Sequence, residues 1–470
     1  MEVPCEKWYA TPDDGAVPEA GQGRRGDPSH RSQPLAFTPA FTMSDAKPEE
    51  QFDIVISGAS FAGLALARAI ASAFGDEIQI AIADPKLPPD RNAANPETTD
   101  ARAFALSAGA RRMLDALGIW SALAPLAQPV TEIQITDSSL EAGVRPVLLK
   151  YDNHLSVPGP DDAKGNAEPA SHIVPASALE RALWDSVAAE PTVTLLAPAA
   201  VASFTDTGTD VKIALDDGRT VRASLLVGAE GRGSPSRRHA KIKAVSWTHD
   251  QTAIVTTIAH ERPHEGRAIQ HFLPAGPFAI LPLQGNRACL TWTEDAEQAR
   301  RILALNDAGF LDEIETRVAG RLGALELTGP RQSWPLATHL TRAYVAPRFA
   351  LVGDAAHGVH PIAGQGVNLA FRDVAALAEI VTDTLRLGLD PGSLEALGRY
   401  ERWRRFDSAM SAAAFDGLNR LFSNDGTLMR AARDFGLGLV DRLPEMKRHL
   451  VAEAAGLTGD LPRLFKAEAL

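Results

Sequence analysis

The pattern of apolar and polar residues predicts a strand–helix–strand unit at residues 53–84. The apolar run DIVISG (53–58) is typical of a buried strand, and FAGLALARAIASAF (61–74) then repeats its apolar residues at helical spacing. A second apolar run, EIQIAIAD (77–84), predicts another strand. Two strands joined by a glycine turn and a helix predict a βαβ unit, in which the strands are parallel.

The pattern changes along the rest of the chain. Between about residues 195 and 340, apolar and polar residues alternate in runs that end in Gly, Asp or Pro turns, which predicts antiparallel strands. These runs are VKIALDD (211–217), TAIVTTIAH (252–260), RAIQHFLPAGPFAILPL (267–283) and RACLTWTED (287–295). After residue 366 the spacing becomes helical, as in DVAALAEIVTDTL (373–385), and we expect helices to the end of the chain.

The first fifty residues differ in composition from the rest. Seven prolines and four glycines, with little periodic apolar pattern, predict a disordered tail over residues 1–50. Met43 begins MSDAKPEEQ, so an alternative is that translation starts there and that residues 1–42 are an artefact of annotation.

Composition narrows the class of protein. The 470 residues include 47 basic and 59 acidic side chains, a formal net charge of −12 that argues against a nucleic-acid partner. Cys5 and Cys289 are far apart in sequence, which argues for a reducing compartment and against disulfide or metal-cluster scaffolds. Because no uncharged apolar run reaches about 18 residues, we expect a cytoplasmic protein, with peripheral contact at the inner face of the membrane left open.

A glycine motif lies at the start of the predicted βαβ unit. GASFAG (58–63) follows a strand and opens a helix, as a G-x-G-x-x-G dinucleotide fingerprint requires. Gly58 allows the tight turn, Gly63 lets helix and strand approach closely, and the amides of Ser60, Phe61 and Ala62 would face a pyrophosphate. Ser60 replaces the middle glycine of the fingerprint. Asp84 ends the second strand, where an acid binds ribose hydroxyls, but the motif does not distinguish FAD from NAD.

A second cluster of chemistry lies in RFALVGDAAHGVHPIAGQGVNLAF (348–371). Asp354, His357 and His360 raise the alternative of a metal site, but Gly358 and Pro361 interrupt the segment, so we expect no metal. The stretch instead predicts a strand, a turn at Asp354 and a loop that leads into a helix. The unpaired amides of that first helical turn suit the N1–C2=O edge of a flavin, and Asp354 suits its ribityl hydroxyls. The residues of this first turn are Gly364, Gln365, Gly366, Val367 and Asn368.

GDAAHGVHPIAGQGVNLAFRD (353–373) resembles the C-terminal FAD motif of the class A flavoprotein aromatic hydroxylases, which share the fold of p-hydroxybenzoate hydroxylase. LLVGAEGRGSPSRR (225–238) resembles the middle motif of this family, with Glu230 where the family usually has Asp. DARAFALSAGARRMLDALGIW (100–120) is similar to the segment after the second strand, and its Arg102 resembles the arginine that contacts FAD. Residues 270–283 and 415–457 are similar to the branch that hydroxylates intermediates of ubiquinone biosynthesis.

The resemblance implies an α/β fold with a Rossmann-like FAD-binding domain, an inserted mixed β-sheet substrate domain and C-terminal helices. We expect the FAD-binding domain at residues 51–125, 170–240 and 341–390, the substrate domain at 126–169 and 241–340, and the helical region at 391–470.

The resemblance also implies the reaction. In the family, NAD(P)H or another electron donor reduces FAD, O2 forms a flavin C4a-hydroperoxide, and its distal oxygen attacks an electron-rich phenol ring. For this branch the substrate would be a polyprenylated phenol. We expect Pro361 and Ile362 near the isoalloxazine, and His360 and Pro361 are the weak catalytic candidates, with His271 a further base to consider. Phe278, Leu281 and Leu283 are expected in the substrate wall, although a plain sheet core is the alternative.

Partners and rival functions remain open from the sequence. Basic residues in the helices at 408–457 raise the hypothesis that this region contacts lipid or other proteins of a quinone-biosynthesis complex; a helical cap over the core is the alternative. An FAD-dependent reductase of a prenyl lipid and a non-catalytic FAD-binding scaffold remain as other functions. The sequence lacks the WxWxIP stretch of flavin halogenases and the cysteine pair of disulfide reductases. The basic residues are Arg430, Arg433, Arg442, Lys447 and Arg448.

Overall fold

The computed structural model describes residues 49–88, 100–137, 140, 147–155, 168–360, 364–422 and 444–470. Pro48–Leu470 forms one compact unit. The predicted tail therefore lies outside the described residues except for its last two, of which Glu50 already belongs to the first strand. The division of this unit into discontinuous domains stays a prediction.

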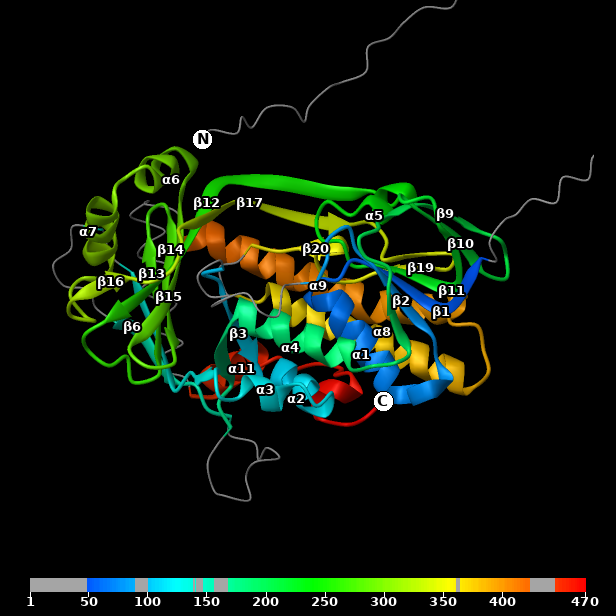
Figure 1. The fold of residues 1–470 in the computed structure, drawn as a ribbon. Helices are drawn as coiled ribbons and strands as arrows, with labels where there is room; N and C mark the ends of the chain where they lie inside the picture. Colours follow the sequence, from blue (N-terminus) through cyan, green and yellow to red (C-terminus); the bar gives the residue numbers. More distant parts are fainter. Residues whose placement is uncertain are drawn as a thin grey trace, which may run out of the picture. The chain divides into compact units, whose positions relative to one another are not determined.

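The predicted βαβ unit is the centre of an eight-stranded sheet (Figure 1). Four of its strands, β1, β2, β11 and β19, are parallel where they pair, and β8 continues this parallel set beyond β2. Helix α1 (Phe61–Phe74) has the limits that the apolar periodicity predicts. The strands are β1 (Glu50–Ser57), β2 (Ile80–Ala83), β8 (Val193–Leu195), β9 (Val201–Asp206), β10 (Val211–Leu215), β11 (Thr220–Gly228), β18 (Val345–Ala346) and β19 (Phe349–Leu351).

The alternating middle of the chain forms a nine-stranded, mostly antiparallel sheet. Its long strands β12 and β17 run from the neighbourhood of α5 to that of β13–β15 (Figure 1). The strands are β5 (Glu132–Asp137), β6 (Val147–Asp152), β12 (Ala244–His260), β13 (Arg267–Leu273), β14 (Gly276–Leu283), β15 (Arg287–Asp295), β16 (Leu325–Leu327), β17 (Gln332–Thr341) and β20 (His357–Gly358). A third, three-stranded sheet contains β3 (Ala103–Ser107), β4 (Gln128–Pro129) and β7 (Ser171–Pro175).

Helices cover both large sheets. Helices α1 and α8 pack on each other, and α9 packs on α8, while α6 and α7 close one face of the nine-stranded sheet through a core around Trp292 and Phe310. The helices are α1, α2 (Ala108–Ala116), α3 (Trp120–Leu123), α4 (Ala176–Ala188), α5 (Pro235–His239), α6 (Ala296–Leu303), α7 (Asp307–Val318), α8 (Gly366–Arg386), α9 (Leu394–Phe422) and α11 (Pro444–Ala454), with 3-10 turns at Gly75–Glu77, Gly353–Ala355 and Arg463–Lys466.

The parallel strands decide where a ligand would bind. Their carboxyl ends meet at one edge of the eight-stranded sheet, and the starts of α1 and α8 follow β1 and β19 in the chain. In open α/β sheets this edge is the usual ligand site. Among the helices that the structure describes, none has both the length and the apolar character that crossing a bilayer requires.

Candidate flavin site

The turn between β1 and α1 is closed by contacts between backbone atoms. Gly58 has φ +105°, and a Cβ built on it would lie 2.8 Å from the carbonyl carbon and oxygen of Ala229. A Cβ on Gly63 would lie 2.0 Å from the carbonyl oxygen of Gly58. Both glycines are therefore required by the packing of the polypeptide itself.

Ser60 explains why the middle position of the fingerprint need not be glycine here. Its hydroxyl donates to the carbonyl of Ala229 (3.0 Å) and accepts from the amide of Gly63 (3.4 Å), so it caps α1 and ties the turn to the end of β11. The amides of Phe61 and Ala62 belong to the first helical turn, where no intrahelical acceptor exists. They remain as donors for an anion at the helix start.

Asp84 lies at the carboxyl end of β2, beside this turn. One carboxylate oxygen accepts from the amide of Ala59 (2.7 Å) and the other from the amide of Lys86 (2.8 Å). The aspartate therefore orders the β1–α1 turn, and the remaining lone pairs of its carboxylate are available to hydroxyl groups.

Aromatic contacts bring Arg102 to the same region. The ring of Phe61 meets that of Phe104 edge to face at 5.2 Å, and the guanidinium of Arg102 lies 6.0 Å from the centre of the Phe104 ring. Arg102 is half-buried and pairs with Asp100 at 2.7 Å. Hydrogen bonds that Arg102 donates to the carboxylate of Asp100 raise the pKa of Arg102 above its ordinary value. Arg102 is thus a fixed cation that is connected to the start of α1 through the rings of Phe104 and Phe61.

The middle and C-terminal motifs meet at the turn Gly353–Ala355. Arg237 on α5 donates to the carbonyl of Ala355 (3.0 Å), and Arg232 lies 3.4 Å from the carboxylate of Asp354. The carboxylate of Asp354 is about half exposed, at 47%, so the ion pair with Arg232 contributes little to stability and leaves the acid accessible.

Glu230 organises the middle motif. Its carboxylate accepts hydrogen bonds from the hydroxyls of Ser57 (2.8 Å) and Ser234 (2.7 Å) and also from the hydroxyl of Ser236. These partners join the end of β1 to the start of α5. The glutamate, one methylene longer than the aspartate usual in the family, spans this gap and is held by the protein.

The start of α8 differs from that of α1. Gly364 has φ +62°, and a Cβ on Gly366 would meet no described atom within 4 Å. Gln365 makes no side-chain capping bond, and the amides of Gly366, Val367 and Asn368 lack intrahelical acceptors. Uncapped amides at a helix start suit an electronegative edge of a planar cofactor. The residues present therefore fit the pyrimidine edge of a flavin.

Asn368 holds this helix start in place. Its side-chain amide donates to the carbonyl of Ala105 (2.9 Å), and its oxygen accepts from the amide of Ser107 (3.0 Å), both on β3. The side chain of Asn368 is thus used within the protein, and only its backbone amide faces the helix start.

A buried ion cluster behind the turn was not singled out from the sequence. Asp373 is fully buried and accepts from Arg404 Nε (2.8 Å), from the amide of Gly353 (3.1 Å) and from His357 Nε2 (2.5 Å). Burial by itself would raise the pKa of Asp373, but His357 and Arg404 outweigh it, so that this pKa lies below its usual range. The sequence signal for this cluster was Asp373 itself, a charged residue in the apolar pattern of the helix predicted at residues 373–385.

His360 lies at the end of the described part of this loop, and Pro361 and Ile362 lie outside the described residues. The ring of His360 meets that of His249 on β12 edge to face at 4.9 Å. Behind it, Asp416 on α9 lies 3.9 Å from His249 Nδ1. Desolvation lowers the pKa of His360 to about 4, and that of His339 on β17 also to about 4.

The three residues expected in a substrate wall lie on two faces of β14. Phe278 is buried against Trp292, in the core that α6 and α7 cover. Leu281 and Leu283 belong to the opposite cluster, with Ala101, Ala103 and Ala105 around β3. His271 is buried on β13, with its Nδ1 hydrogen-bonded to the hydroxyl of Thr136 (2.5 Å). Leu281 and Leu283 therefore share the face nearest Arg102 and Asn368, and Phe278 does not.

Most of the basic residues expected at a membrane or partner surface lie outside the residues that the structure describes. Arg430, Arg433 and Arg442 lie outside the described residues, as does the side chain of Lys447. Arg448 is exposed on α11 and pairs with Glu445.

Comparisons with known proteins identify the family of this chain. Residues 51–406 match the FAD binding domain family. The chain is 40% identical to ubiquinone hydroxylase UbiL of Rhodospirillum rubrum, over 88% of this chain and 92% of that protein. It is 30% identical to the human ubiquinone biosynthesis monooxygenase COQ6 (88% and 94%) and 31% identical to 3-demethoxyubiquinol 3-hydroxylase of Escherichia coli (76% and 88%).

Solved structures share the fold. The p-nitrophenol 4-monooxygenase PnpA of Pseudomonas putida superposes with a TM-score of 0.69 at 16% identity, covering 87% of this chain and 99% of that chain. The PqsL protein of Pseudomonas aeruginosa gives 0.66 at 21% identity, covering 82% and 100%. The family match and the sequence relatives show that the chain belongs to the FAD binding domain family and is an FAD-dependent monooxygenase related to the ubiquinone hydroxylases.

Proposed function

We propose that this protein hydroxylates the aromatic ring of a polyprenylated phenol in ubiquinone biosynthesis, with FAD, O2 and either NAD(P)H or another electron donor. The similarity to the Rhodospirillum ubiquinone hydroxylase, which spans 88% of the chain, supports the substrate class. The geometric observation that carries the proposal is the uncapped start of α8, where a Cβ on Gly366 would meet no described atom within 4 Å.

Residues around the first helix start would hold the nucleotide part of FAD. The amides of Ser60, Phe61 and Ala62 would face the pyrophosphate, and Asp84 would accept from ribose hydroxyls. Arg102, fixed by Asp100, would add positive charge beside the phosphates. Asp354, accessible at the end of β19, would accept from the ribityl chain.

Residues around α8 would control the reacting ring system. Bound FAD supplies the electron transfer and oxygen chemistry. The amides of Gly366, Val367 and Asn368 would stabilise negative charge at the pyrimidine edge, in an environment of low dielectric. The apolar face formed by Ala101, Leu281 and Leu283 would exclude water from the ring that is hydroxylated.

His360 is the candidate base for the phenol proton, since it lies at the end of the described loop that leads towards α8. Desolvation lowers the pKa of His360 to about 4, so its ring is neutral at neutral pH and is a weak base for this proton. His249 and Asp416 line up behind it, from a strand and a helix that are far apart in sequence. These two residues would position His360 rather than contact substrate themselves.

The purified protein tests the proposal directly. We expect a yellow protein that consumes O2 when it is reduced in the presence of a prenylated phenol, and a product heavier by one oxygen atom. Asp354→Ala should weaken FAD binding by roughly tenfold, because a charged acceptor is lost. Asp312→Ala, an exposed acid on α7, is the control and should leave FAD binding unchanged.

Two outcomes would contradict the proposal. A reduced prenyl product without oxygen uptake would indicate a reductase, and a colourless protein that does not take up FAD would exclude both reactions. In cells, deletion of the gene should cause a quinone precursor that lacks one ring hydroxyl to accumulate; an unchanged quinone profile would contradict the pathway.

A further inference from the structure

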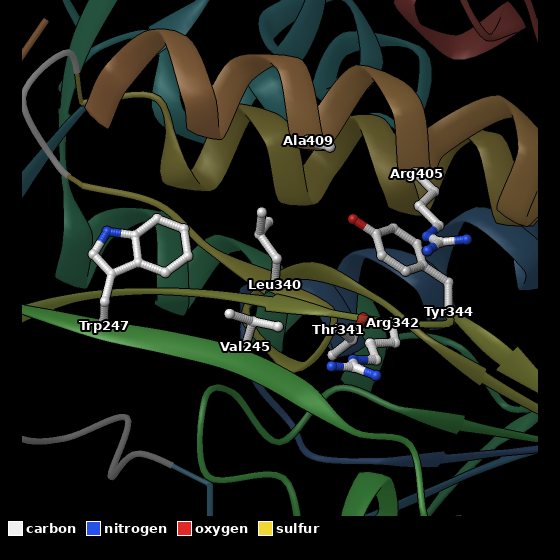
Figure 2. A pocket seen from close by; sticks show the side chains of 8 residues that line it. All are labelled: Val245, Trp247, Leu340, Thr341, Arg342, Tyr344, Arg405 and Ala409. Atoms are coloured by element: carbon white, nitrogen blue, oxygen red, sulfur yellow. The ribbon is translucent and has the colours of Figure 1, made fainter. Parts of the chain in front are cut away.

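A groove lies between α9 and the β12–β17 ribbon. Its volume is about 330 Å³, and Figure 2 shows α9 along one side and the two strands along the other. Val245, Trp247 and Leu340 rise from the strands, and Ala409 faces them from the helix. This volume lies near the lower end of the range of about 300–1,000 Å³ that small-molecule sites occupy.

The groove has one apolar end and one basic end. Trp247, Val245, Leu340 and Ala409 lie towards one end in Figure 2, and Arg342 and Arg405 lie beside Tyr344 at the other. Both arginines are exposed, so their charges remain in water while the opposite end is lined by carbon atoms. The groove therefore suits a long apolar molecule better than a compact polar one.

The apolar end adjoins the loop that leads into α8. Leu340 pairs with His357 across β17 and β20 and packs against a buried cluster that contains Val359 and Leu369. The indole N–H of Trp247 donates to Asp416 (3.2 Å). Asp416 in turn lies 3.9 Å from His249 Nδ1, and the ring of His249 contacts the ring of His360. A ligand that fills the groove would thus have one end next to the proposed site of the ring.

Exposed apolar side chains follow the groove residues of α9 in the chain. Phe406 and Met410, one turn apart on α9, are 74% and 54% exposed and flank Arg405 and Ala409. The amide of Arg342 donates to the carbonyl of Lys243 (2.8 Å), which brings a further exposed cation to this side. Exposed apolar side chains among cations suit a surface that meets anionic lipid.

We propose that this groove binds the polyprenyl chain of the substrate, with the chain running from beside His357 and Val359 past Leu340 and Ala409 to the surface at Phe406. The inference rests on the proposed function for the identity of the ligand. A polyprenyl chain leaves the bilayer only if another apolar surface receives it, because exposure of its length to water is strongly unfavourable. The groove would supply that surface while the ring enters the site.

The test fills the groove without altering the flavin site. Ala409→Phe places a ring between helix and strands, and Val245→Trp, at an exposed position on β12, fills it from the opposite wall. The matched control is Ala414→Phe, an exposed alanine on the same helix that does not line the groove. Thermal unfolding and FAD content should be the same for all three variants and the wild type.

The first measurement is binding of a farnesyl chain that carries a fluorophore, followed by fluorescence anisotropy. We expect Ala409→Phe and Val245→Trp each to weaken binding by about tenfold or more, the size of effect that overpacking of a site produces. Ala414→Phe should bind as the wild type does. Equal binding by the groove variants and the wild type, or equal weakening by the control, would overturn the assignment of the groove.

The second measurement separates the groove from the proposed reaction. Turnover is compared for a farnesylated phenol and for the same phenol without the chain. The groove variants should raise KM for the farnesylated phenol about tenfold and leave turnover of the short phenol unchanged. If the wild type hydroxylates neither phenol but binds the probe through the groove, the proposed function fails and the groove stands. If both phenols are hydroxylated equally well by every variant, the groove assignment fails and the function stands.

Discussion

The starts of α1 and α8 offer the same kind of donor to a cofactor, but they are built differently. At α1, a Cβ on Gly63 would lie 2.0 Å from the carbonyl oxygen of Gly58, so the glycine is demanded by the polypeptide. At α8, a Cβ on Gly366 would meet no described atom within 4 Å. Glycine therefore occurs for a different reason at each helix start. At α1 the backbone of the protein leaves no room for a side chain, and at α8 the glycine is consistent with a bound ligand.

The two helix starts also differ in what fixes them. Short backbone contacts and the hydroxyl of Ser60 close the first. The second is held from outside its own turn, by the clamp of Asn368 onto β3 and by the buried ion cluster of Asp373, Arg404 and His357. The start of α1 is therefore rigid before a phosphate binds. The shape of the proposed ring site at α8 instead depends on the side chains that hold this helix in place. Variants should therefore separate the two sites.

The largest effect is expected from Asp373→Ala. The change leaves the buried guanidinium of Arg404 without its main partner, and loss of one member of a buried ion pair costs about 3–5 kcal/mol. Urea unfolding should show this loss, and the protein should no longer retain FAD. Asp407→Ala removes the half-exposed partner of Arg404 and should cost much less. Equal stabilities of the two variants would contradict the central role of Asp373.

Gly63→Ala should be the next most damaging change. The new methyl group would overlap the carbonyl oxygen of Gly58, and overpacking of this kind costs about 1–3 kcal/mol. The melting temperature should fall in the FAD-free protein as much as in the loaded protein, because the strain is internal. A loss of stability seen only with FAD present would mean that Gly63 is required by the ligand instead.

Gly366→Ala should leave the fold intact and affect FAD alone. Alanine is favoured over glycine in a helix, so the free energy of unfolding of the FAD-free protein should be unchanged or slightly higher. The methyl group would stand at the uncapped start of α8, where the ring is proposed to bind, and the Kd for FAD should rise roughly tenfold or more. Flavin fluorescence titration measures this. Unaltered FAD affinity would remove the main geometric support for a ring site at α8.

The smallest effect concerns acid sensitivity. Desolvation lowers the pKa of His360 and of His339 to about 4 from a usual value of 6.5. The unfolded chain therefore binds more protons than the folded protein between these values, so stability is complete above about pH 6.5 and falls as the pH approaches 4. His360→Gln should flatten this fall, as followed by thermal melts across the range. A wild-type melting temperature that does not change over the same range would contradict the neutral, buried state of these rings.

Much of the fold could be predicted because its signals are local. The periodicity of residues 61–74 gives the limits of α1, since the apolar face, the capping serine and the following glycine all lie within one helix length. The antiparallel runs also located β10, β13, β14 and β15 and the second half of β12, which begins at Ala244 and not at residue 252. The glycine motifs likewise located both helix starts.

What the tertiary structure decided are the partners that lie far apart in sequence. Asn368 reaches Ala105 across 263 positions, and Arg404 reaches Asp373 across 31. Strand order, and not local pattern, decides that Leu281 and Leu283 face β3 while Phe278 faces the core under α6 and α7. The sequence by itself determined the elements and the kind of cofactor that suits them, because periodicity and turn chemistry act over a few residues. Only the folded sheet decided which side chains hold the second helix start and which line the groove beside α9, because packing joins residues without regard to their separation along the chain.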